Sequence, residues 1–382
     1  MRIVCFLIGL GLIVIVLSDA FETILQPRRV IHRFRFSRLF YRNIWTLWRT
    51  TACSISRGKV RQAFLSTFGP FSLLGLFIVW VTCLIIGFGI LHWSLQTTVR
   101  APEQYDTIWT YIYLSGTTFF TLGYGDVTPV TSMGRTLAVV ESGLGFGFLA
   151  VIISYLPVLY QAFSHREVTI SLMDARAGSP PSASEVLRRA GNSGDFKIID
   201  SLLKEWETWA AELLESHLSF PVISYYRSQH DNQSWLGALT CMLDSSAAII
   251  ALISNHNSYQ AQLTFAMCRH AAVDLTLILK SNPIDSPQPR LSDEDFQRMI
   301  ATLRQANLQL DDSKEAQAKL AELRYMYEPF VNALAKRLML SIPQIIPPQI
   351  VADNWQRSPT QPRTPGIGGL PAAHFKKDDH FA

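Results

Sequence analysis

Apolar residues gather into three long runs in the first half of the chain. Residues 64–91 contain no charged residue, residues 136–163 contain one acid, and the run of residues 3–18 extends to position 25 across two acids. A helix of about 20 apolar residues spans a hydrocarbon core of ~30 Å. The pattern therefore predicts a first transmembrane helix in residues 1–25 and two more that bound a domain covering residues 64–163.

From position 164 onward, apolar residues recur with the period of an amphipathic helix. The predicted helices cover residues 183–189, 196–218, 235–252, 259–279, 296–308 and 315–340. They predict a helical cytoplasmic domain over residues 164–345. A disordered tail is expected at residues 346–382, because Pro and Gly are frequent there. The predicted fold class is an all-α membrane protein with three transmembrane helices and a helical cytoplasmic domain.

The distribution of charge predicts the orientation of the spans. Ten Lys and Arg residues and no acid lie between positions 27 and 62. The positive-inside rule places such a segment in the cytoplasm, so the N-terminus lies outside and the C-terminal half is cytoplasmic. A cleaved secretory signal would translocate this segment, so residues 1–25 are interpreted as an uncleaved helix. We expect a multi-pass protein of the cell membrane, plasma or inner.

The basic segment, residues 26–63, also has an apolar face. Phe36, Phe40, Ile44 and Trp48 recur at helical spacing, while the arginines lie largely elsewhere. Such a helix lies in the membrane interface and is drawn to anionic lipid. The residues expected to contact lipid are Arg33, Arg35, Arg38 and Arg42. The alternative is a solvated connector that only enforces the topology.

The composition agrees with a membrane protein. Of the 382 residues, 48% are hydrophobic and 17% are charged, whereas about a quarter are charged in soluble proteins. The net charge of +4 gives no indication of nucleic-acid binding. The five cysteines lack the spacing of a zinc site, and the cytoplasmic half has no GxGxxG loop. We expect no enzymatic activity and no cofactor apart from a permeant ion.

A shorter apolar stretch lies between the second and third runs. Residues 107–119 would form a helix of ~20 Å, too short to cross, with Asp106 as a candidate N-cap. The stretch ends in Thr121-Leu122-Gly123-Tyr124-Gly125-Asp126. Glycine permits left-handed backbone, so alternate glycines can point successive carbonyls the same way. Non-helical backbone at membrane depth is tolerated where it lines a water-filled path, which predicts a re-entrant helix and loop.

The sequence TLGYGD between two spans resembles the filter of the potassium channel family, in the tetrameric pore-loop form of prokaryotic two-span channels. The resemblance covers about residues 64–163 and implies a homotetramer, because each chain contributes one strand of the filter. It implies a negative charge at the pore mouth from Asp126 and a brace behind the filter from Tyr113. The backbone carbonyls that it implies as ligands of dehydrated K⁺ are those of Thr121, Leu122, Gly123 and Tyr124.

The third run contains the residues expected to form the gate. By the same resemblance Gly145 occupies the hinge position of the lining helix, with Gly147 beside it; the alternative is that these glycines let helices pack closely. Pro157 lacks a backbone donor, so it either bends the gate-forming end or, as we expect, ends the helix. Glu141, the one acid of this run, either faces the cavity or hydrogen-bonds behind the filter to threonine hydroxyls of the short helix.

Together these features predict a homotetrameric, potassium-selective channel that is gated by its inner helix, with a cytoplasmic domain that assembles or regulates the pore. One alternative is a less selective cation channel, which the intact Tyr124 disfavours. The other is a membrane-anchored signalling or scaffold protein whose pore is silent. Neither the gating stimulus nor a ligand of the cytoplasmic domain is indicated by any motif.

Overall fold

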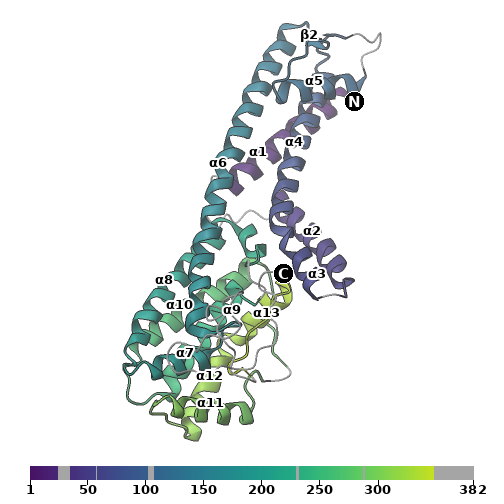
Figure 1. Ribbon diagram of the computed structural model, residues 1–382. Helices are drawn as coiled ribbons and strands as arrows, with labels where there is room; N and C mark the ends of the chain where they lie inside the picture. Colours follow the sequence, from purple (N-terminus) through teal and green to yellow (C-terminus); the bar gives the residue numbers. More distant parts are fainter. Residues whose placement is uncertain (25–34, 57, 102–106, 229–231, 287–288, 348–382) are drawn as a thin grey trace, which may run out of the picture. The chain divides into compact units, whose positions relative to one another are not determined.

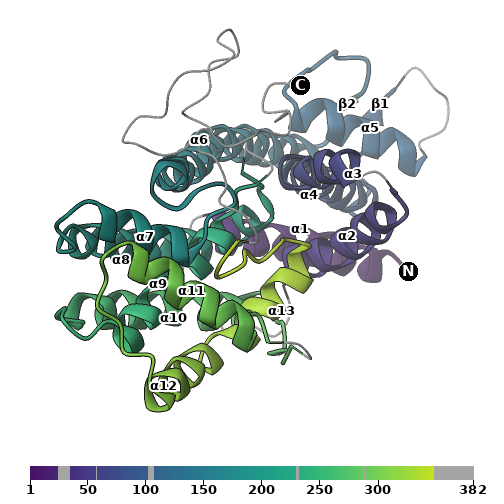
Figure 2. The ribbon, with the colours of Figure 1, turned by 60° about the horizontal axis from the view of Figure 1, so that its bottom comes forward.

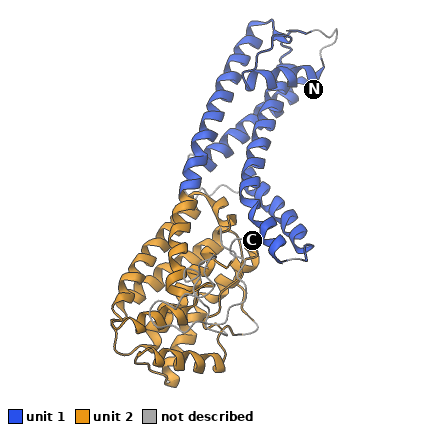
Figure 3. Cartoon of the chain, viewed as in Figure 1, with its two compact units in different colours: residues 1–161 blue, residues 162–382 orange. Residues whose placement is uncertain are grey.

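The computed structural model describes residues 1–24, 35–56, 58–101, 107–228, 232–286 and 289–347. The regular elements within these ranges are helices, apart from one short ribbon in which β1 (Val99–Arg100) pairs antiparallel with β2 (Thr128–Pro129). The predicted all-α fold class is therefore confirmed. The chain divides into two compact units, residues 1–161 and residues 162–382 (Figure 3).

Unit 1 contains the long apolar helices. Its helical elements are α1 (Arg2–Ile24), α2 (Phe36–Cys53), α3 (Gly58–Ser66), α4 (Phe68–Ser94), α5 (Ile108–Phe119) and the first part of α6 (Ser132–Ala177). α1, α6 and the continuous stretch of α3 and α4 are each long and apolar enough to cross a membrane. α1 runs along α4, and the short α5 packs against α4 as well (Figure 1). Each of the three apolar runs thus forms a helix.

α1 and α4 approach closely because two glycines face each other where the helices meet. A Cβ placed on Gly9 would lie 2.9 Å from the Gly87 carbonyl oxygen, and one on Gly87 would lie 2.8 Å from the Ile13 side chain. Small residues allow apolar helices to pack backbone against backbone. The first helix is therefore an integral part of unit 1.

A buried aspartate joins α1 to both α2 and α4. Asp19 is 5% exposed. Its carboxylate accepts hydrogen bonds of 3.0 Å from the Ser37 amide, the Ser37 hydroxyl and the Trp80 indole nitrogen. The first amides of a helix lack partners within it and favour a negative charge, so Asp19 caps α2 from a neighbouring helix. This acid in the first apolar run therefore positions the basic helix.

Replacing Asp19 by alanine is expected to destabilise the protein by about 2–3 kcal/mol, because a charged acceptor is lost and buried donors are left without a partner. The thermal unfolding midpoint of the full chain in detergent measures this loss. Ser18→Ala is the matched control, since Ser18 is the exposed residue one position earlier on α1. Equal midpoints for the two variants would show that Asp19 has no such role.

α6 is a continuous helix of 46 residues that contains Pro157. The expectation that Pro157 ends this helix is wrong, because the helix continues to Ala177. Proline removes one backbone donor and crowds the carbonyl four residues earlier, here that of Ile153. Both defects are local, and the helical turns on either side of Pro157 preserve the helix. α6 therefore runs without a break from unit 1 into unit 2.

Unit 2 is a helical domain. After α6 its elements are α7 (Ala183–Asn192), α8 (Ile198–Ser219), the 3-10 helix η1 (Pro221–Tyr225), α9 (Trp235–Leu252), α10 (Tyr259–Ile278), α11 (Asp293–Gln305), α12 (Lys314–Tyr325) and α13 (Glu328–Leu338). α10 packs against both α8 and α9 (Figure 2). By length and hydropathy α9 could cross a membrane, yet every residue except Ile250 is buried. Its apolar character is explained by its place in the core of unit 2.

The helix predicted at residues 315–340 is divided into α12 and α13. The break precedes Pro329, which is the second residue of α13. Proline is favourable in the first turn of a helix and unfavourable within one, so Pro329 marks a helix start. The Tyr327 hydroxyl in the break contacts Asp244 of α9, whose carboxylate also accepts a 2.7 Å hydrogen bond from Arg290. This buried network ties the C-terminal helices to the core helix.

Candidate functional site

The glycine-rich loop is positioned by α5. This helix begins after Thr107, whose hydroxyl lies 3.3 Å from that of Thr110 in a capping box. The predicted N-cap, Asp106, lies outside the described residues. Twelve residues give a helix of about 18 Å. A Cβ on Gly89 of α4 would lie 3.0 Å from Ile112 Cα, so the backbones of α4 and α5 are in direct contact. α5 is thus a short helix fixed against a long one.

The loop that follows α5 alternates in backbone handedness. The φ angle is +56° at Thr121, +58° at Gly123 and +79° at Gly125, and it is negative at the residues between them. The amides of Leu122 and Gly123 donate to the Thr117 carbonyl of α5 at 2.8 and 3.4 Å. Alternation of this kind turns successive carbonyls towards one side. The loop is therefore anchored to α5 by its amides and can present its carbonyl oxygens to an ion.

A tyrosine of α5 holds the far end of the loop. The Tyr113 hydroxyl donates to Asp126 Oδ2 at 2.8 Å, and Asp126 Oδ1 accepts from the Val127 amide at 3.0 Å. Tyr113 thus contacts the last residue of the TLGYGD sequence, and its role as a brace stays a prediction. Two donors fix the Asp126 carboxylate beside the loop, where its charge attracts cations.

Gly145 of α6 lies against the C-terminal end of α5. A Cβ placed on Gly145 would lie 2.3 Å from the Phe119 carbonyl oxygen, whereas one on Gly147 would meet no atom within 4 Å. Close packing is therefore the interpretation that this contact favours for Gly145, and Gly147 has no such contact within the chain. Pro157 lies further along the same helix, away from these contacts.

Glu141 of α6 is fully buried behind α5. Its Oε1 atom contacts the Ser115 hydroxyl of α5, and its Oε2 atom lies 3.7 Å from Nε2 of His92 on α4. All three side chains have 0% exposure. The position behind the loop, one of the two that the sequence leaves open for Glu141, is therefore the one observed. Its partners are Ser115 and His92 instead of threonine hydroxyls.

His92 and Ser115 were not predicted as site residues. The sequence does contain a signal for His92, because it directly follows the uncharged run of residues 64–91, and ionisable groups in or beside a span are unusual. Ser115 has no comparable signal, since a helical serine ordinarily bonds to the backbone of its own helix. The three residues lie on three helices, so only the fold brings them together.

The four arginines expected to contact lipid have different surroundings. Arg33 lies outside the described residues. The Arg35 guanidinium lies 3.5 Å from Glu22 and 3.3 Å from Thr23, so it is engaged by α1. Arg38 and Arg42 are exposed on α2. Two of the four arginines, Arg38 and Arg42, are therefore accessible to a lipid headgroup.

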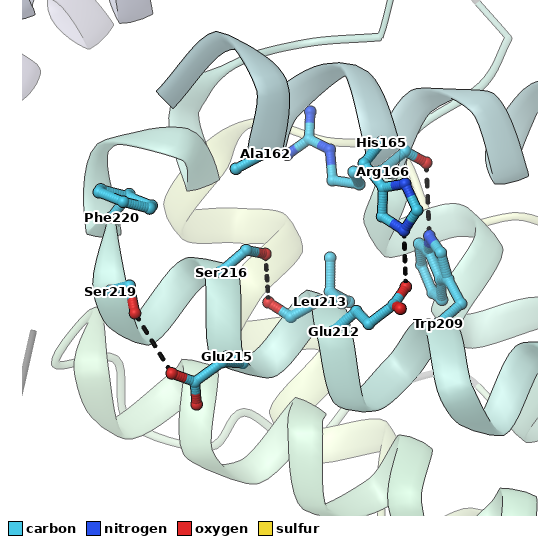
Figure 4. A pocket seen from close by; sticks show the side chains of 10 residues that line it. All are labelled: Ala162, His165, Arg166, Trp209, Glu212, Leu213, Glu215, Ser216, Ser219 and Phe220. Carbon is cyan, nitrogen blue, oxygen red and sulfur yellow. Dashed lines mark hydrogen bonds and ion pairs between the residues drawn. The ribbon is translucent and has the colours of Figure 1, made fainter. Parts of the chain in front are cut away.

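Unit 2 contains a pocket between α6 and α8 (Figure 4). Its volume is about 330 Å³ and its walls are mostly apolar. On one wall His165 lies 3.0 Å from Glu212. Behind it the buried Arg166 guanidinium donates at 3.1 and 2.9 Å to two carbonyls of the segment after α8. Burial, together with Arg166 beside it, lowers the pKa of His217 to about 3, so this imidazole stays neutral at physiological pH.

Comparison with known proteins identifies relatives of this chain. The ion channel family matches residues 78–161. The uncharacterized membrane protein YdjJ of Bacillus subtilis is 25% identical over 190 residues, which cover 48% of this chain and 54% of YdjJ. Protein LctB of Geobacillus stearothermophilus is 32% identical, and that of Bacillus caldotenax 30% identical, each over 91 residues that cover 21% of this chain and 67% of the relative. The chain thus spans about half of YdjJ and two thirds of LctB. No solved structure matches the chain.

Proposed function

Because the chain belongs to the ion channel family through residues 78–161, we propose that it is a potassium-selective channel. In this proposal four copies surround one pore, and each contributes α5, the loop that follows it and α6. Unit 2 follows the pore directly through the continuous α6, which makes it the part suited to assemble or regulate the channel. Membership of this family favours ion transport over catalysis.

The observation that carries the proposal is the backbone of the TLGYGD loop. Positive φ angles at Thr121, Gly123 and Gly125 alternate with negative ones, which is the geometry that aligns carbonyls. A row of carbonyl oxygens replaces the hydration shell of a K⁺ ion at little energetic penalty. The ligands in this proposal are the carbonyls of Thr121, Leu122, Gly123 and Tyr124, with the Thr121 hydroxyl. The C-terminal end of α5 adds partial negative charge on the ion path.

The exposed side of α6 supports a homotetramer. One face of the helix packs within the chain through Glu141, Gly145 and Phe148. On the opposite face apolar side chains recur every seven residues, with exposures of 73%, 71%, 70% and 64% at Val139, Phe146, Ile153 and Tyr160. A helix that is apolar all round lies in a protein core or in a membrane. In the proposed tetramer this second face lines the cavity and meets the neighbouring copy.

The same proposal fixes a topology in the cell membrane. α1, α4 and α6 cross the membrane, α5 and its loop re-enter from the outer side, and the basic segment lies in the cytoplasm with unit 2. α2 then lies at the inner interface, where the exposed Arg38 and Arg42 contact anionic lipid. An exposed leucine between them, Leu39, suits this position because it can enter the apolar boundary.

K⁺ and Na⁺ flux through liposomes that contain the purified full chain tests the proposal. We expect K⁺ flux that is at least roughly tenfold faster than Na⁺ flux, since carbonyl ligands discriminate between the two ions. Gly123→Asp is the pore-dead control, because it adds a carboxylate to each of the four filter strands. Non-selective flux that this control removes would assign the chain to the general cation channels. Tetramers without flux in any condition would favour a scaffold.

A further inference from the structure

Three helices meet behind the loop at two ionisable side chains. His92 of α4 and Glu141 of α6 face each other with Ser115 of α5 between their helices, and none of the three is exposed. Buried ionisable groups in a membrane span are energetically expensive. The other partners of these two side chains among the described residues, Ser115 and Thr97, are uncharged and do not require a carboxyl or an imidazole at this place.

The hydrogen-bond partners of His92 and Glu141 lie on one side of each group. His92 Nδ1 lies 3.0 Å from the Thr97 hydroxyl, which also donates to the His92 carbonyl at 3.1 Å. The Ser115 hydroxyl donates to Glu141 Oε1 and also lies 2.8 Å from the Ile85 carbonyl. The second nitrogen of His92 and the second oxygen of Glu141 remain on the side where the two residues face each other.

This arrangement leaves one contact without a hydrogen bond. His92 Nε2 and Glu141 Oε2 are both buried, neither has a hydrogen-bond partner among the described residues, and they lie 3.7 Å apart. A hydrogen bond between nitrogen and oxygen measures about 2.7–3.2 Å. A proton bound between these two atoms would allow the contact to shorten into a hydrogen bond.

We propose that His92 and Glu141 form a proton-binding site that positions α5, and that proton uptake at this site increases K⁺ flux through the filter. A hydronium ion transfers its proton to the lone pair of His92 Nε2 and leaves as water, so one O–H bond breaks and one N–H bond forms. The new N–H donates to Glu141 Oε2. The contact then draws α4 and α6 together around Ser115. His92 and Glu141 thus act as positioning residues for the loop, whose amides are hydrogen-bonded to the Thr117 carbonyl of α5.

The surroundings of the pair contain no competing charge within the described residues. α5 contributes the Ser115 hydroxyl, and the segment after α4 contributes Thr97, whose carbonyl accepts from the Tyr111 hydroxyl at 3.1 Å. α1 also packs on α4, but none of its described titratable side chains contacts the pair. The pair itself is therefore the proton-binding group of this proposal.

The test measures K⁺ flux of the reconstituted full chain as a function of pH. We expect an increase of about fivefold on acidification, as the formation of one hydrogen bond produces. In His92→Gln a permanent amide donor faces Glu141, so the flux is expected to be high and independent of pH. His165→Gln, a change in an exposed histidine of α6, is the matched control and is expected to retain the wild-type response.

The proton site rests on the proposed channel function, and the flux measurements distinguish a failure of one from a failure of the other. Absence of K⁺-selective flux at every pH would contradict the channel itself. Selective flux with the same pH response in wild type and His92→Gln would overturn the proton site alone. A second measurement requires neither flux nor a variant: the ¹⁵N chemical shifts of the His92 ring in the full chain. A proton that binds Nε2 on acidification is expected, and a ring that is doubly protonated throughout would overturn the proposal.

Discussion

Gly123→Ala is expected to abolish K⁺-selective flux. The φ angle of Gly123 is +58°, a left-handed conformation that strains any L-residue with a side chain by roughly 1–2 kcal/mol. A tetramer contains this strain four times around one narrow axis. A Cβ at Gly123 would meet no atom within 4 Å in its own chain, so the effect arises from the backbone of the filter and not from a clash within the subunit.

Liposome flux of K⁺ and Na⁺ measures this effect, and the thermal unfolding midpoint shows whether the subunits remain folded. Gly116→Ala is the matched control. Gly116 lies within α5, where a Cβ would be 3.8 Å from Ile85, an ordinary contact, and alanine favours a helix. We expect this control to retain selective flux. Wild-type selectivity in Gly123→Ala would show that the loop does not bind the ion through its aligned carbonyls.

The parts of the fold that depend on local pattern are readily predicted from the sequence. Residues 235–252 were predicted as a helix with the same limits as α9, because a long apolar segment with no Pro and a single Gly in its first turn has few alternatives to a helix. The three apolar runs follow the same logic. A hydrocarbon core requires internal backbone hydrogen bonds, so a run of this length becomes a helix whatever surrounds it.

Whether a helix ends or continues at a proline was predicted less well from the sequence. Pro157 and Pro329 are both prolines in apolar helical sequence, yet α6 continues through Pro157 while α13 begins just before Pro329. In the second break Tyr327 contacts Asp244 of another helix. Such a partner 83 positions away in the sequence is not visible in a local pattern.

For the candidate site, the sequence singled out the loop and also Glu141 and Gly145, but not the residues that these two contact. TLGYGD is contiguous, so its backbone requirements can be inferred from six neighbouring residues. The support of the loop comes from two helices that pack against α5, in three contacts: Gly89 of α4 against Ile112, and Gly145 and Glu141 of α6 against Phe119 and Ser115. Each contact joins residues that are more than 20 positions apart. α5 is thus fixed from both sides, and any change in its position is transmitted to Thr121 two residues beyond its end.

Gly145→Ala is the variant expected to shift α5, and with it the loop at Thr121, the most. Its Cβ would lie 2.3 Å from the Phe119 carbonyl oxygen, and a backbone atom cannot rotate away as a side chain can. Overpacking of a well-packed contact costs about 1–3 kcal/mol per subunit, and relief requires that α5 shifts with the filter. We therefore expect loss of K⁺ flux together with a lower thermal unfolding midpoint.

Gly147→Ala is the matched control, because it makes the same change two residues along α6, where a Cβ meets no atom within 4 Å in the chain. If Gly145 serves close packing, only Gly145→Ala loses flux and stability, since only its methyl group has a backbone atom in its path. If instead the two glycines act as a hinge, both variants stiffen α6, so both should alter channel opening while their unfolding midpoints stay at the wild-type value. Measuring flux and midpoint in the same preparations therefore distinguishes a packing contact from a hinge.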